Sequence, residues 1–126
     1  MESILLIGGV FNLIGGIGIL LSIFIRIPFG YPGIPPAGDI VPRDYMQFRF
    51  FCVGTAFSFG TMYLYLYRHP QHAIPFLFFG MGLKYWAFAS SLIAKIRYNM
   101  PNDAFLLFGV SNLLVGVLFT IYLLAV

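Results

Sequence analysis

The segment ILLIGGVFNLIGGIGILLSIFI, residues 4–25, decides the fold class because it contains no charged side chain from end to end. A helix of about 20 apolar residues spans the hydrocarbon core of a bilayer. Three further apolar stretches follow, at 46–67, 74–94 and 104–126. Of the 126 residues only 9% are charged, against about a quarter in a soluble domain. We therefore predict an all-α integral membrane protein, folded as an antiparallel four-transmembrane-helix bundle.

The connections between these stretches are too short to fold separately, so residues 1–126 are expected to form a single membrane domain. The longest connection, 27–45, is rich in proline and glycine, which predicts an extended or turn-rich loop. No hydrophilic segment could form a soluble catalytic domain. The seven Lys and Arg residues are scattered along the chain rather than gathered in a basic stripe, so nucleic acid is not an expected partner.

The basic residues also predict an orientation. The first and third connections and the helix ends beside them carry five of the seven, and the second connection carries only Arg68. Cytoplasmic loops of membrane proteins are enriched in Lys and Arg. Both termini are therefore predicted to lie on the non-cytoplasmic side, where "inside" would mean matrix or stroma in an organelle. The five residues are Arg26, Arg43, Arg49, Lys95 and Arg97.

The first and last stretches share a pattern of glycine and asparagine displaced by 100 positions. In each, the spacings of three and four place the small residues and the amide on one helix face. Small residues allow close helix approach, and an Asn amide can bond across to another helix. A packing seam within the bundle or between protomers is the preferred interpretation, and an inverted duplication is the less favoured one. The matching residues are Gly9, Asn12 and Gly16 in one stretch and Gly109, Asn112 and Gly116 in the other.

Lys84 is the most informative charge because it lies ten residues into the third stretch, about 15 Å deep. An ionisable side chain at that depth is costly and indicates function by default. All four acidic residues lie outside the apolar stretches, so no carboxylate is expected at matching depth. Three explanations remain open: Lys84 is uncharged, it meets an anionic group of a ligand, lipid or partner subunit, or it is hydrated in an internal cavity.

Arg49 admits two interpretations. It lies one turn into the second stretch, so it either anchors the helix at the headgroups, which is favoured, or lines an electropositive entrance shallower than Lys84. Lys84, Arg49, Asn12 and Asn112 are the candidate ligand-binding residues. Gly80, one turn before Lys84, leaves room for a ligand or for a neighbouring helix.

Signals for chemistry are weak. His69 and His72 supply two metal ligands where zinc takes four, so no metal site is expected. Motifs typical of hydrolases and phosphotransferases are missing from the sequence, so no catalytic residue is predicted. The sequence does not identify a cofactor.

Three functions are compatible with these features. The favoured one is a small noncatalytic membrane subunit that packs with partner chains or itself and accepts an anionic or lipid-like group near Lys84. The alternative is an oligomeric transporter or channel for anions or small solutes, with Lys84 at its central site. A membrane oxidoreductase ranks third because its chemistry would have to come from a bound cofactor. The expected partners are membrane lipids and either copies of this chain or other membrane subunits.

Overall fold

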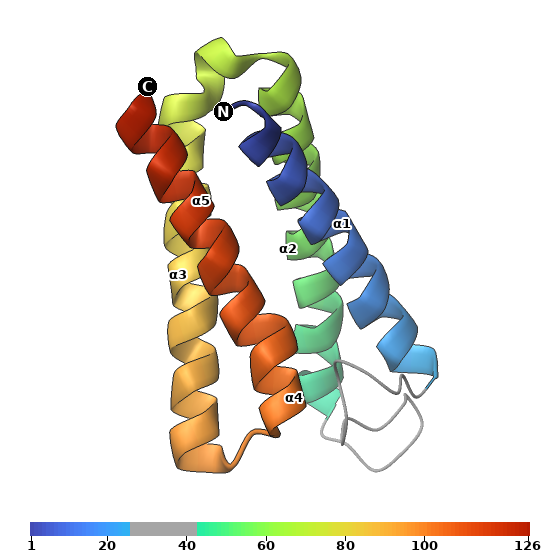
Figure 1. Cartoon of the computed structure of the whole chain (residues 1–126). Coiled ribbons are helices and arrows are strands. Elements are labelled where there is room, and N and C mark those ends of the chain that lie inside the picture. Colours follow the sequence, from blue (N-terminus) through green and yellow to red (C-terminus); the bar gives the residue numbers. More distant parts are fainter. Residues whose placement is uncertain (26–42) are drawn as a thin grey trace.

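The computed structural model describes residues 1–25 and 43–126, and Figure 1 shows them as long helices with both chain termini at the same end. Within these residues, four helical segments are long and apolar enough to cross a membrane, as predicted. Of the predicted loop at 27–45, residues 27–42 lie outside the described residues. Residues 43–45 belong to a helix instead, so the loop prediction was wrong at its C-terminal end.

The first two long helices are α1, Ser3–Phe24, and α2, Arg43–Arg68. These helices cover the predicted stretches 4–25 and 46–67 almost completely, and α2 begins three residues before its predicted stretch. A polar first turn is compatible with a helix that continues out of the hydrocarbon, because helical bonding does not need an apolar side chain. A short 3-10 helix, η1, Pro70–His72, then joins α2 directly to the third long helix.

The third helix, α3, Ala73–Tyr98, extends four residues beyond the predicted end at 94. The two basic residues in its last turn, Lys95 and Arg97, are compatible with a helix C-terminus, where the helix dipole favours positive charge. The helix ends at Asn99, which adopts a left-handed conformation with φ 54°. Asn is one of the few residues that accept this backbone geometry, so local chemistry sets the end of α3.

The fourth helical segment is continuous but not uniform. It consists of α4, Asn102–Ala104, a π-helical turn η2, Phe105–Val110, and α5, Ser111–Ala125. A π-helical turn inside an α-helix is rare and often lies at a functional site.

The helices form two pairs. Helix α1 packs mainly on α2, and α3 packs mainly on α5, while contacts between the pairs are fewer. At the end of the molecule that holds the termini, the pairs share an apolar core in which the rings of Tyr63 and Phe119 lie 4.8 Å apart. The core residues are Ile4, Leu5, Tyr63, Leu66, Ala73, Leu77, Val115, Phe119 and Tyr122.

The repeated glycines lie where the helices of each pair approach closely. A Cβ atom added at Gly9 would meet the Leu64 side chain at 2.6 Å, so α1 and α2 pack closely there. A Cβ added at Gly109 would meet the Cβ of Ser91 at 2.8 Å, and one added at Gly116 would meet that of Lys84 at 3.2 Å. Close packing at these glycines therefore occurs within the chain, between α1 and α2 and between α3 and α5.

Candidate ligand-binding site

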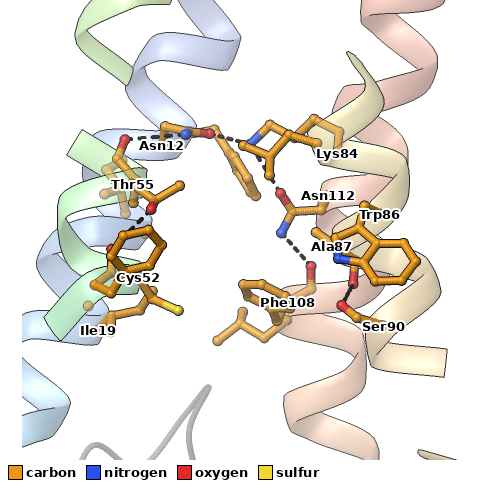
Figure 2. Close-up of a pocket in the computed structure, with 18 residues that line it drawn as sticks. Asn12, Ile19, Cys52, Thr55, Lys84, Trp86, Ala87, Ser90, Phe108 and Asn112 are labelled. Carbon is orange, nitrogen blue, oxygen red and sulfur yellow. Dashed lines mark hydrogen bonds between the residues drawn. The ribbon is translucent and has the colours of Figure 1, made fainter. Parts of the chain in front are cut away.

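Lys84 lies near the middle of α3 and is buried, with 3% of its surface exposed. Its amine donates hydrogen bonds to Oδ1 of Asn12 on α1 and, at 3.1 Å, to Oδ1 of Asn112 on α5. Figure 2 shows Lys84 reaching across to Asn12, with Asn112 beneath it. Lys84, Asn12 and Asn112, here called the polar trio, connect the two helix pairs. The structure thus brings together three of the four candidate residues.

A backbone carbonyl that accepts a hydrogen bond from the amide nitrogen sets the orientation of each asparagine side chain. Asn12 Nδ2 donates to the carbonyl of Ala56 at 3.2 Å, and Asn112 Nδ2 donates to the carbonyl of Phe108 at 2.7 Å. With both amide nitrogens held in this way, both amide oxygens face Lys84. Phe108 belongs to the π-helical turn, so this irregularity in the fourth helical segment directly supports the position of Asn112.

The amine of Lys84 also lies near two aromatic rings. Its amine lies 4.7 Å from the centre of the Phe11 ring and 5.8 Å from that of Tyr63, within the range of cation–π attraction. Within the described part of the chain, every hydrogen-bond and ring partner of Lys84 is therefore uncharged. Amide oxygens and ring faces favour an ammonium group, but they do not neutralise it.

A cavity of about 580 Å³ adjoins the polar trio and is lined by all four helical segments. This size lies within the range of about 300 to 1,000 Å³ that is typical of small-molecule sites. The trio forms its polar end, and most of the remaining wall is apolar, as Figure 2 shows for Ile19 and Phe108. A few polar groups in a mostly apolar cavity are characteristic of a ligand site.

Two hydroxyl groups in the cavity wall donate hydrogen bonds to backbone carbonyls of their own helices. Thr55 donates to the carbonyl of Phe51 at 3.0 Å, and Ser90 donates to that of Ala87 at 3.0 Å. Cys52, the only cysteine of the chain, is exposed and also lines the cavity.

Arg49, the fourth candidate residue, does not join this group. Its side chain is buried between α1 and α2, where Nη2 donates to Oγ of Ser22 at 2.8 Å. Ser22 in turn donates to the carbonyl of Ile19 at 2.6 Å, so its hydroxyl is oriented to accept from Arg49. Arg49 is not among the residues that line the described cavity. The interpretation of Arg49 as a headgroup anchor stays a prediction.

The residues adjacent to Lys84 point in different directions, as expected for neighbours on a helix. Tyr85 bonds to Thr120 through their hydroxyl groups at 2.6 Å, which ties α3 to α5. Trp86 lines the cavity. Gly80 provides room for a neighbouring helix, because a Cβ there would meet the Tyr63 hydroxyl at 2.5 Å.

The two histidines stack with Tyr65 at the turn between α2 and α3. The rings of Tyr65 and His69 lie 4.4 Å apart, and the Tyr65 hydroxyl lies 3.2 Å from Nδ1 of His72. Among residues 1–25 and 43–126, no group of three or more potential metal ligands is present.

Sequence reasoning offered an internal cavity only as one of three explanations for Lys84, and it missed the aromatic contact from Phe11. It named the asparagines as candidate ligand-binding residues and as groups that bond between helices, but it did not predict their hydrogen bonds to Lys84. The signal that could have joined them to Lys84 is depth, since all three residues lie near the middle of their predicted stretches. Comparisons of the chain with protein-family models, curated proteins and solved structures found no match.

Proposed function

We propose that this chain is a small noncatalytic membrane protein that binds an anionic or lipid-like group at Lys84. It crosses the bilayer four times in alternating directions, with both termini on the non-cytoplasmic side. The observation that carries the proposal is the placement of one lysine, bonded only to neutral groups among the described residues, at the polar end of a largely apolar cavity.

The physical argument concerns the cost of this lysine. An ammonium group at the middle of a membrane span costs at least about 2.5 to 3.5 kcal/mol. Two amide oxygens recover part of that cost through charge-assisted hydrogen bonds, but they leave the positive charge in place. A ligand that brings a negative charge or a strong acceptor into the cavity would offset the rest. The same groups therefore favour an occupied site over an empty one.

The outward helix faces support a role beside other membrane components. Large apolar side chains such as Phe79 and Ile96 are exposed on α3, and Ile14 and Leu124 are exposed on α1 and α5. Such surfaces suit lipid tails or neighbouring transmembrane helices. We therefore place the protein in contact with lipids and with copies of itself or other membrane subunits.

Transport of an anion or small solute is a second candidate function, with Lys84 at its central site. The observation that favours it is the depth of the cavity, which ends at a charged residue near the middle of a predicted span. Vesicles containing the purified protein distinguish the two functions. Anion flux that disappears in a Lys84→Met variant would favour transport, whereas ligand retention without flux would favour the binding function.

Native mass spectrometry of protein extracted gently from its own membrane tests the binding proposal. Wild-type protein is expected to carry a bound small molecule that Lys84→Met lacks. Lys95→Met is the matched control, because Lys95 contacts Asn102 and Phe105 outside the cavity. The proposal fails if Lys84→Met is folded and retains the same bound mass as wild type.

A further inference from the structure

The hydrogen-bond donors in the cavity restrict the head group that a ligand can present. An ammonium group has three N–H donors, and the trio uses two of those of Lys84. The amide nitrogens of Asn12 and Asn112 and the hydroxyls of Thr55 and Ser90 already bond to backbone carbonyls. Each amide nitrogen keeps a second N–H, but that donor is neutral, so the third N–H of Lys84 is the one charged donor that remains in the cavity wall. A phosphate group carries up to two negative charges, and the single ammonium group of Lys84 neutralises only one of them.

The wall of the cavity restricts how a ligand arrives. Several lining residues in the helix interiors have large exposed fractions, including Phe51 at 70% and Trp86 at 63%. Ile14 and Leu107 are also exposed and also line the cavity. We call these four residues the lateral rim. All are predominantly apolar and lie within the candidate membrane spans, so the rim would face lipid chains rather than water.

From these two restrictions we infer that the cavity takes a single-chain amphiphile with a carboxylate head, which enters from the hydrocarbon through the lateral rim. The carboxylate accepts the remaining N–H of Lys84 and supplies one negative charge. The apolar chain lies along the cavity wall and contacts its apolar side chains. This inference rests on the proposed binding function and adds the ligand class and its route.

The ligand class follows from charge and donor number together. One ammonium group and one carboxylate balance in charge, and a carboxylate can accept the one charged N–H that Lys84 has left. An inorganic anion would satisfy Lys84 as well but would leave the apolar part of a cavity of about 580 Å³ without contacts. A long-chain fatty acid satisfies both parts of the cavity.

Cys52 provides the readout, because it is the only thiol of the chain and it lines the cavity. The full-length protein is placed in phosphatidylcholine nanodiscs, and the rate of Cys52 alkylation by N-ethylmaleimide is followed by intact mass. Oleic acid at ten times its dissociation constant is expected to slow alkylation about tenfold by occupancy. Methyl oleate, which has no charged head, and octadecyl phosphate are expected to protect much less at the same concentration.

Two variants test whether protection depends on the charge of Lys84. Lys84→Met should lose protection, and Lys95→Met should keep it. Asn12→Asp is the second variant, because it places an internal carboxylate on Lys84 with little change in shape. Asn12 is preferred to Asn112 for this change, since its nitrogen lies farther from the carbonyl it bonds, 3.2 Å against 2.7 Å. Protection by oleic acid should fall at least fivefold in Asn12→Asp, by competition for the same ammonium group.

The outcomes separate the inference from the proposed function. If chloride or inorganic phosphate protects Cys52 in a Lys84-dependent manner and oleic acid does not, the amphiphile is wrong and the binding function stands. Stronger protection by octadecyl phosphate or methyl oleate than by oleic acid overturns the carboxylate head. If no probe protects Cys52 in folded wild-type protein, both proposals fail.

Discussion

A variant in which only Lys84 is replaced should be less stable than a variant in which all three residues of the polar trio are replaced. In Lys84→Met, the amide oxygens of Asn12 and Asn112 remain buried and lose their donor. In the triple variant Lys84→Met, Asn12→Leu and Asn112→Leu, no such acceptor remains. The comparison asks whether the trio is present for stability or for a ligand.

The magnitudes follow from the contacts. Losing two hydrogen bonds to a charged donor costs about 3 to 6 kcal/mol, and removing a lysine from the middle of a span returns about 3 kcal/mol. Lys84→Met is therefore expected to lose between about 0 and 3 kcal/mol. Two unsatisfied amide oxygens cost about 2 to 6 kcal/mol, and the leucines give up two amide N–H bonds worth about 1 to 3 kcal/mol together. The triple variant should therefore be more stable than Lys84→Met by about 2 kcal/mol. The adjoining cavity gives the leucines space.

The assay is the free energy of unfolding in mixed micelles, followed by helicity as sodium dodecyl sulfate is added. Wild type, Lys84→Met and the triple variant are compared in the same lipid. A triple variant no more stable than Lys84→Met would refute the reasoning, because the amide oxygens would then carry no penalty. A triple variant at least as stable as wild type, but without bound ligand, would assign the trio to binding rather than to folding.

Three further predictions concern packing, and the same unfolding titration checks each. Gly9→Ala should cost about 1 to 3 kcal/mol by overpacking, whereas Gly15→Ala, where an added Cβ meets nothing within 4 Å, should be neutral or stabilising; equal effects would exclude close packing at Gly9. Tyr63→Phe should stabilise by about 1 kcal/mol, because the Tyr63 hydroxyl is buried without a partner among the described residues, and a loss of stability would reveal a partner for it. Ser22→Ala should cost about 1.5 to 3 kcal/mol by removing an acceptor from Arg49, and a neutral result would mean that other contacts hold the guanidinium.

Much of the fold could be predicted from the sequence because long uncharged stretches allow few alternatives. Residues 4–25 could only be a long apolar helix, and the structure has α1 at Ser3–Phe24. Helix ends were less predictable. The third helix was predicted to end at 94, just before the basic residue Lys95, but the backbone geometry of Asn99 ends α3 instead. Crossing of a membrane and the side on which the termini lie remain predictions.

The candidate site was predictable in its members but not in its geometry. Lys84 stood out because of its depth, and the search for a partner looked for a carboxylate. The partners are two neutral amides from opposite ends of the sequence, 72 and 28 residues away from Lys84. The bond from Arg49 to Ser22 could not be predicted, because no sequence pattern linked the two residues. Contacts between distant residues do not follow from local periodicity.

The assignment of the trio to different helix pairs has a consequence for biosynthesis. The chain is made from its N-terminus, so α1 and α2, with Asn12, precede α3, which carries Lys84. Asn112 follows with α5, the helix on which α3 packs. In the membrane protein that we propose, one amide is therefore already in the bilayer when the lysine enters, and the second arrives with the next helix. The costliest side chain of the protein is never required to enter the membrane before its first partner.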